Sequence, residues 1–199
     1  MNRMEQPQRE YAGYIFDLDG TLVDSMPQHY KAWGKALRDV GLPLFDEDVY
    51  YSMGGRAATD IVAEMAEAQG RSDIDPEEVA RNKRMYYFEQ LKKTPACPIS
   101  EVIDFVRAHQ GRVPLSIATG SALPGALETL KCAGLNDIFD IIVTPADVEH
   151  GKPAPDMFLL AAKKMGVPAS ECCVFEDADP GILGATRAGM DCVRVHRAS

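Results

Sequence analysis

Short apolar segments recur along this chain, and most are followed by a stretch with helical spacing. The apolar segments are 13–16, 113–118, 140–143, 172–175 and 192–195. They are almost continuously apolar rather than alternating, which is typical of strands buried on both faces of a parallel sheet. Apolar residues at three- and four-residue spacing predict helices at 99–110, 121–133, 156–166 and 180–189. This βαβ series predicts an α/β domain with an open, doubly wound parallel sheet.

The interval from Met26 to Thr94 breaks this rhythm, because it contains no convincing strand. It shows helical patterns at 27–40, 55–69 and 76–92. Asp75 followed by Pro76 is typical of a helix N-cap and first helical position. We therefore expect an α-helical cap domain over residues 26–94, inserted into a core domain formed by residues 1–25 and 95–199.

Composition and charge exclude several classes of partner. The formal net charge of −9 argues against a nucleic-acid or anionic-membrane surface, since both favour clustered Lys and Arg. The apolar runs are far shorter than the ~20 residues of a membrane span, and the polar N-terminus shows no secretory signal. The five cysteines are odd in number and form no CxxC pair, so we expect buried free thiols. These features predict a cytoplasmic protein.

Polar side chains stand where the predicted strands end. Ligands of a doubly wound sheet bind beyond the carboxyl ends of its strands, and those ends carry Asp17, Asp19, Thr119, Glu176 and Asp177. The segment 17–21, Asp-Leu-Asp-Gly-Thr, also suits an ordinary polar turn. It does not suit a calcium loop, which needs glycine at its sixth position rather than its fourth. Its meaning therefore depends on the partners that follow it along the chain.

Four segments together resemble the motifs of the haloacid dehalogenase superfamily, in the usual order. They are 16–22 (FDLDGTL), 117–121 (IATGS), 151–156 (GKPAPD) and 174–177 (VFED). The helical insert after the first motif resembles that superfamily's cap. The combination is most similar to the branch that holds β-phosphoglucomutase and small sugar-phosphate phosphatases, including the bacterial fructose-1-phosphate phosphatase type. This resemblance implies a phosphoryl-transfer enzyme.

The resemblance implies a role for each motif residue. Asp17 would be the nucleophile, since an aspartate is already anionic at neutral pH and needs no activating base. An anion repels a phosphate, so a divalent cation is required, and an all-oxygen site favours Mg²⁺. Its ligands would be the side chains of Asp17 and Asp177 and the backbone carbonyl of Asp19, with Glu176 in the outer shell.

The remaining motif residues would act on protons and on the phosphoryl group. The Asp19 side chain would protonate the leaving oxygen and later take a proton from water. Lys152 would supply a fixed positive charge, and Thr119 with nearby backbone N–H groups would hold the phosphoryl oxygens. Gly120 and Ser121 are assigned to substrate binding.

Two cap residues are candidates for substrate binding. His29 matches a position where the related mutase carries a histidine near the site, and an ordinary helix-surface histidine is the alternative. Arg56 follows two glycines and would clamp a phosphate or carboxylate, although the mutase arginine stands farther beyond the glycine. Asp24 and Ser25 are expected to cap the first helix of the insert.

The leading functional hypothesis is a monomeric, Mg²⁺-dependent phosphatase acting on a small phosphorylated metabolite, with a sugar phosphate expected. The mutase has polar residues where this chain has Ala122 and Leu123, and their loss favours hydrolysis over a second transfer. A phosphosugar mutase remains the alternative. A non-enzymatic phosphoacceptor module is a third reading, but it gives no reason for Asp19 or for the helical insert.

Overall fold

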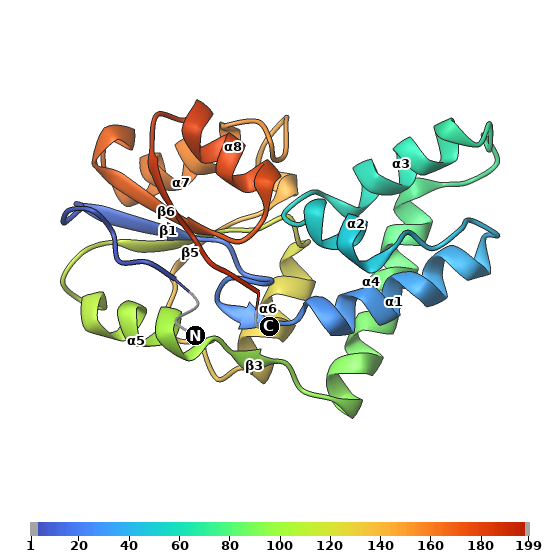
Figure 1. Ribbon diagram of the computed structural model, residues 1–199, viewed down its shortest axis with the longest axis horizontal. Helices are drawn as coiled ribbons and strands as arrows, with labels where there is room; N and C mark the ends of the chain where they lie inside the picture. The colour runs from blue at the N-terminus through green and yellow to red at the C-terminus, as the bar shows by residue number, and fades with distance from the viewer. Residues whose placement is uncertain (1–3, 198–199) are drawn as a thin grey trace.

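The computed structural model describes residues 4–197 (Figure 1). Its main sheet has five strands in the order β5-β4-β1-β6-β7, and every neighbouring pair is parallel. The strands are β1 Gly13–Phe16, β4 Leu115–Ala118, β5 Ile141–Val143, β6 Cys172–Glu176 and β7 Asp191–Arg194. This arrangement confirms the predicted doubly wound parallel sheet.

Helices cover both faces of this sheet, as the βαβ series requires. They are α5 Ser100–His109, α6 Leu123–Cys132, α7 Asp156–Met165 and α8 Asp179–Arg187. In Figure 1, α5 and α6 lie on one side of the sheet and α7 and α8 on the other. Two short 3₁₀ helices, Pro145–Asp147 and Ala169–Glu171, complete the connections.

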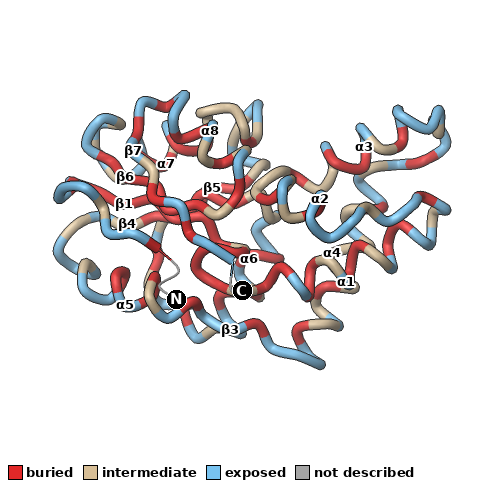
Figure 2. Tube along the Cα trace, viewed as in Figure 1, coloured by how far each residue is buried: buried red, intermediate tan, exposed pale blue. Residues whose placement is uncertain are grey.

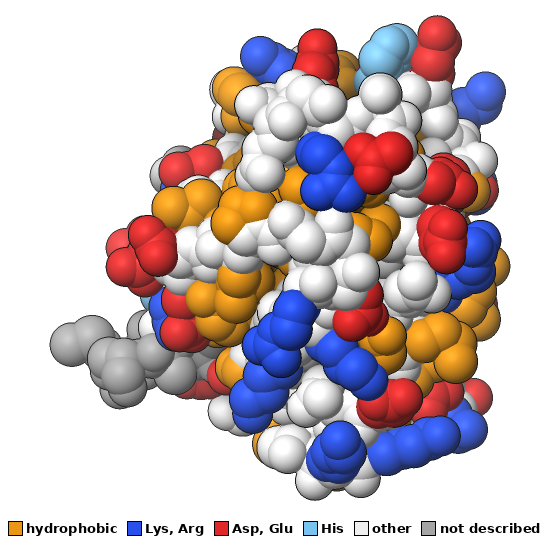
Figure 3. All heavy atoms as spheres, turned by 90° about the vertical axis from the view of Figure 1, so that its right-hand side faces the viewer, with side chains coloured by type: hydrophobic (Ala, Val, Ile, Leu, Met, Phe, Trp, Pro, Cys, Tyr) orange, Lys and Arg blue, Asp and Glu red, His pale blue; other side chains and the backbone are white. Residues whose placement is uncertain are grey.

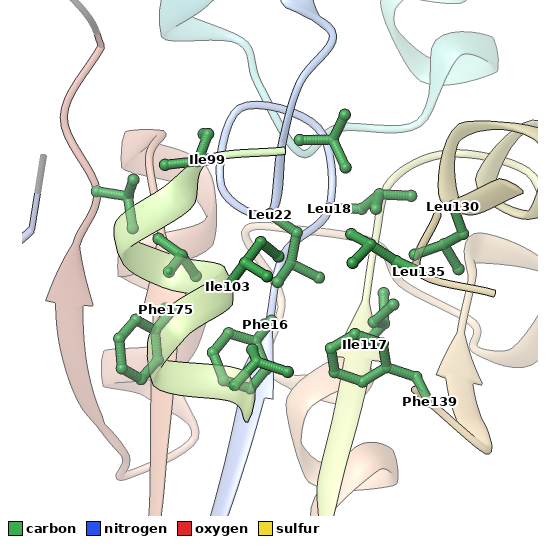
Figure 4. Close-up of a cluster of buried hydrophobic side chains, with 14 of the residues drawn as sticks. Phe16, Leu18, Leu22, Ile99, Ile103, Ile117, Leu130, Leu135, Phe139 and Phe175 are labelled. Carbon is green, nitrogen blue, oxygen red and sulfur yellow. The ribbon is translucent and has the colours of Figure 1, made fainter. Parts of the chain in front are cut away.

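Successive strand residues pack into different hydrophobic clusters, which explains the continuous apolar runs. In β1, Phe16 belongs to the cluster under α5 and α6, whereas Ile15 belongs to the cluster under α7 and α8. Phe16 stacks on Phe175 of β6 at 4.8 Å between ring centroids, beside Ile103 of α5 (Figure 4). Because side chains alternate between the faces of a strand, burial on both faces favours apolar residues at nearly every position. The three central strands β4, β1 and β6 are accordingly buried almost throughout, whereas the edge strands β5 and β7 are partly exposed (Figure 2).

The insert consists of helices α1 Met26–Asp39, α2 Glu47–Ser52, α3 Ala58–Ala68 and α4 Pro76–Lys93. They enclose a hydrophobic cluster of their own around Trp33 and Leu37. Helices α1, α3 and α4 correspond to the three predicted helices, whereas α2 was not predicted. Asp75 caps α4 as expected, by accepting a hydrogen bond from the Glu77 amide at 3.0 Å. The cap end of the molecule carries interspersed acidic and basic side chains rather than one sign (Figure 3).

Two features of the connection between insert and core were not predicted. The strands β2 Val23–Asp24 and β3 Cys97–Pro98 form a two-stranded antiparallel sheet where the chain leaves and re-enters the core. In addition, Tyr87 and Leu91 of α4 belong to the core's hydrophobic cluster, so this helix packs against both parts. The domain boundaries at residues 26 and 94 remain a prediction.

Two smaller expectations are also settled. All five cysteines are free, but Cys97 and Cys132 are exposed, so the prediction of buried thiols is wrong for these two. Cys172 and Cys173 are buried in β6, and Cys192 of β7 is partly buried. Within residues 4–197, no helix has the length and apolarity needed to cross a bilayer.

Candidate active site

The predicted acidic residues converge because β1 and β6 are neighbours with their carboxyl ends at the same edge. Asp17 follows β1, and Glu176 and Asp177 lie at the end of β6. One carboxylate oxygen from each of these three residues lies within 4.8 Å of the others. Thr119 follows β4 on the other side of β1 and is also buried. The structure therefore brings these predicted residues together at one edge of the sheet.

Lys152 is the counter-charge of this cluster. Its Nζ lies 2.6 Å from Asp17 Oδ1 and 2.6 Å from Glu176 Oε1, and its side chain is fully buried. Burial raises the pKa of Asp17 to about 8, with a further contribution from Glu176 and an opposing one from Lys152. Burial alone would lower the pKa of Lys152, but the two carboxylates raise it well above its ordinary value. The lysine is therefore a permanent cation within the site.

Glu176 has both carboxylate oxygens engaged by the protein. Oε1 accepts from Lys152, and Oε2 accepts from the Ala178 amide at 2.9 Å. A Cβ added at Gly181 would lie 1.8 Å from Glu176 Oε1, so only glycine allows this side chain its position. This engagement agrees with an outer-shell role for Glu176.

Asp177 is held by the DLDGT segment itself. The hydroxyl of Thr21 donates to Asp177 Oδ1 at 2.9 Å. Gly20 has a φ of 100°, and a Cβ there would lie 2.4 Å from Asp177 Oδ2. Burial, together with nearby Glu176 and Asp17, raises the pKa of Asp177. Three crowded carboxylates beside one ammonium group form an oxygen-donor set that fits a divalent cation.

Asp19 lies beside this cluster and accepts two short hydrogen bonds. Ser25 Oγ donates to Oδ1 at 2.6 Å, and Ser121 Oγ donates to Oδ2 at 2.6 Å. Ser25 occupies the N-cap position of α1 but makes no capping hydrogen bond, so its predicted capping role is wrong. Its backbone has helical dihedral angles (φ −107°, ψ −7°) rather than the extended conformation typical of a capping residue, and its hydroxyl donates to Asp19 instead.

The neighbours of Asp19 lower its pKa. Its Oδ1 lies 3.0 Å from His29 Nε2, without the alignment of a full hydrogen bond. Burial raises the pKa of Asp19, but His29 and the two serine hydroxyls lower it by more, so it lies well below its ordinary value. Asp19 is therefore ionised in this arrangement.

His29 connects Asp19 to the cap helix α4. Its Nδ1 lies 2.8 Å from Lys83 Nζ, and its ring stacks on Tyr87 at 3.6 Å. Burial lowers the pKa of both groups, that of Lys83 to about 8. Since an ammonium group only donates, Nδ1 accepts and the proton of the neutral ring is on Nε2, facing Asp19. His29 thus contacts the predicted acid rather than standing on the helix surface.

A cavity of about 540 Å³ opens between cap and core above these groups. Thr119, Gly120 and Ser121 line its floor, together with Asp17 and Asp19. The hydroxyl of Thr119 accepts from the Ser121 amide at 3.1 Å, which fixes the turn after β4.

The cap loop that carries Arg56 rests on this turn. A Cβ added at Gly120 would lie 2.2 Å from the Gly55 carbonyl oxygen, so the two backbones are in close contact. Arg56 lines the cavity, but its guanidinium pairs with Glu64 within the cap. Its predicted role as a substrate clamp therefore requires exchange of that partner.

Sequence reasoning missed three residues that hold the site together. Thr21 lies within the first motif and Ser25 just after it, but their partners are visible only in three dimensions. Lys83 shows only helical spacing with Tyr87 in the sequence, and its contact with His29 requires α1 and α4 to pack side by side.

Known proteins share both the sequence and the arrangement. The haloacid dehalogenase-like hydrolase family model matches residues 11–189. Fructose-1-phosphate phosphatase YqaB of Escherichia coli (strain K12) is 40% identical over 189 residues, covering 93% of this chain and 96% of that protein. Hexitol phosphatase A of the same organism is 34% identical over 185 residues, covering 92% and 82%.

A solved structure extends the comparison to the fold. The β-phosphoglucomutase of Clostridium difficile superposes with a TM-score of 0.78 at 26% identity, covering 92% of this chain and 83% of that one. The family match over residues 11–189 and the 40% identity to a phosphatase show that the chain belongs to the haloacid dehalogenase-like hydrolase family.

Proposed function

We propose that this protein is a phosphatase that hydrolyses a small sugar phosphate through a phospho-aspartate intermediate on Asp17. One observation carries the proposal: Asp17 lies against the buried Lys152 at the floor of a cavity that also exposes Asp19. The substrate class is supported by the relatives, whose names specify fructose 1-phosphate and hexitol phosphates as their substrates.

The first half-reaction transfers the phosphoryl group to the enzyme. A carboxylate oxygen of Asp17 attacks phosphorus, and the bond from phosphorus to the sugar oxygen breaks. Lys152 stabilises the negative charge around the transferring group, and the Thr119 turn offers it hydrogen-bond donors. A protonated Asp19 gives its proton to the leaving oxygen, so that the sugar departs as a neutral alcohol.

Asp19 must gain a proton before this step. Its pKa is low in the arrangement described, but a bound phosphate dianion places a like charge nearby and raises it. In the second half-reaction the ionised Asp19 takes a proton from water, which attacks phosphorus. The acyl phosphate bond then breaks, which releases inorganic phosphate and restores Asp17.

The acidic cluster would hold Mg²⁺ through the side chains of Asp17 and Asp177 and the backbone carbonyl of Asp19. When bound, the ion would offset the repulsion between the carboxylates and the phosphate. Glu176 would remain in the outer shell, because both of its oxygens are already hydrogen-bonded.

A mutase reaction is less well supported than hydrolysis. A second transfer needs the phosphorylated sugar to be retained and turned round. Ala122, Leu123 and Pro124, which follow Ser121 on the cavity wall, have no charged side chain to hold a second phosphate, and the arginines that α4 adds to the cavity are accompanied by carboxylates. The fold that this chain shares with a β-phosphoglucomutase does not by itself keep a phosphorylated sugar in the cavity for a second transfer.

The test is a phosphate-release screen over fructose 1-phosphate, glucose 1-phosphate and hexitol phosphates, with Mg²⁺ present. We expect release from at least one of them and its loss in Asp17→Asn. Substantial turnover by that variant would refute the nucleophile assignment. Isomerisation primed by a sugar bisphosphate, without phosphate release, would instead establish a mutase.

A further inference from the structure

The cap helix α4 presents two arginines to the cavity in addition to Lys83. Arg81 and Arg84 are three residues apart, so they lie on one face of the helix, and both line the cavity. Neither guanidinium forms an ion pair with a carboxylate among residues 4–197, whereas Arg56 is paired with Glu64. Arg84 is half-buried and Arg81 exposed, which makes Arg84 the better placed donor.

Arg84 lies on the cavity wall, against the helix that follows Ser121. A Cβ added at Gly125 would be 3.9 Å from Arg84 Cδ, so the aliphatic part of the Arg84 side chain packs against the first turn of α6. That turn begins just after Ser121, whose hydroxyl binds Asp19. A leaving group whose oxygen meets Asp19 therefore extends along this wall toward Arg84.

The charges that line the cavity as a whole suit hydroxyl groups better than a second anion. Besides the two arginines, the carboxylates of Asp60, Glu77 and Glu149 line the cavity. Each sugar hydroxyl both donates and accepts, so a wall with guanidinium donors and carboxylate acceptors can satisfy it. The same carboxylates would repel a second phosphate.

We propose that Arg84 is a specificity-determining residue, which recognises a hexose- or hexitol-sized leaving group by donating hydrogen bonds to its distal hydroxyl oxygens. This inference rests on the proposed phosphatase function. It adds that the enzyme distinguishes substrates by the length of their leaving group. A short leaving group would react at Asp17 and Asp19 without reaching Arg84.

The experiment compares a long and a short substrate in the variant Arg84→Met. Removing hydrogen bonds from a charged donor should raise KM for fructose 1-phosphate at least about tenfold. Hydrolysis of acetyl phosphate, whose leaving group has two carbons, should change by less than about twofold. Arg84→Lys keeps the charge but not the planar fork and should show an intermediate KM. Arg107→Met, on the exposed side of α5, is the matched control and should leave both substrates unaffected.

Three results would overturn the inference. One is an unchanged KM for fructose 1-phosphate in Arg84→Met, and another is an equal loss on both substrates. The third is a wild-type preference for a hexose bisphosphate over the monophosphate that Arg84→Met abolishes, which would assign the arginine to a second anion. If the wild-type protein releases no phosphate from any of these compounds, the proposed function fails instead.

Discussion

At the scale of single residues, Asp19 must be protonated in one step and ionised in the next, because it acts as both acid and base. Two serine hydroxyls and His29 hold it ionised, which suits the water-activating step. The protonating step requires the bound phosphate to shift its pKa upward. The acid role should therefore be visible only with substrates whose leaving group needs a proton.

We predict that Asp19→Asn slows hydrolysis of an alkyl phosphate about 10²–10⁴-fold but affects p-nitrophenyl phosphate much less in its first step. The p-nitrophenolate ion leaves without protonation, whereas a sugar alkoxide does not. Burst kinetics with both substrates measure the phosphorylation step. Asp179→Asn, an exposed residue of α8, is the control. Equal losses in the bursts of both substrates would count against the acid role.

Lys83 should act on the reaction through His29. Replacing it in Lys83→Met removes the donor to Nδ1, so the proton of the neutral ring is no longer confined to Nε2. We expect ¹⁵N NMR to show a mixture of His29 tautomers and kcat to fall several-fold. A single unchanged tautomer with normal kcat would show that Lys83 serves only in packing against Tyr87.

At the scale of elements, the sequence predicted what depends on repeated burial and missed what depends on a single contact. The strands were predictable because burial on both faces makes each run apolar. The strands β2 and β3 have two residues each and the helix α2 has six, too few to show a period. The contact of Ser25 with Asp19 depends on how the chain turns between β1 and α1, and the contact of Lys83 with His29 depends on how α1 and α4 pack. No local sequence pattern records either contact.

The contact between the cap loop and the turn after β4 gives a prediction at this scale. Gly120→Ala would place a Cβ 2.2 Å from the Gly55 carbonyl oxygen, and because that atom is backbone, the loop must move away. We expect kcat/KM for sugar phosphates to fall at least about tenfold while the far-UV circular dichroism spectrum is retained.

A matched control for this variant is Gly34→Ala within α1. Its added Cβ meets only the end of the Leu44 side chain, at 3.4 Å, and alanine favours the helix. Activity should be unchanged in this control. Full activity in Gly120→Ala would mean that the cap loop is free to lie elsewhere during turnover.

At the scale of the whole molecule, a chain with a net charge of −9 is expected to receive an anionic substrate. The positive charge needed for this is local: Lys152 is buried among carboxylates, and the acidic cluster is suited to bind a cation. The same crowding lowers the stability of the metal-free folded state. Carboxylates that are forced together and buried destabilise the folded state whenever they are all ionised.

This cost predicts how stability depends on pH. The pKa of Asp17 is raised from 3.8 to about 8 in the folded protein, and that of Asp177 is also raised. Across that window the folded state holds protons that the unfolded state has lost, so the unfolding free energy falls as pH rises. Asp19, whose pKa is lowered, acts only below about pH 4 and does not offset this trend.

We therefore predict that the metal-free protein has a lower Tm at pH 8 than at pH 5.5, and that Mg²⁺ raises the Tm more at pH 8. Saturating Mg²⁺ at about 100 times its Kd would add about 2.7 kcal/mol to the unfolding free energy. Differential scanning fluorimetry in EDTA and in MgCl₂, at matched ionic strength, measures both effects. Asp177→Asn should lose most of the Mg²⁺ response and flatten the pH dependence. If that variant responds to Mg²⁺ like the wild type, the ion binds elsewhere, and the acidic cluster must be stabilised by Lys152 alone.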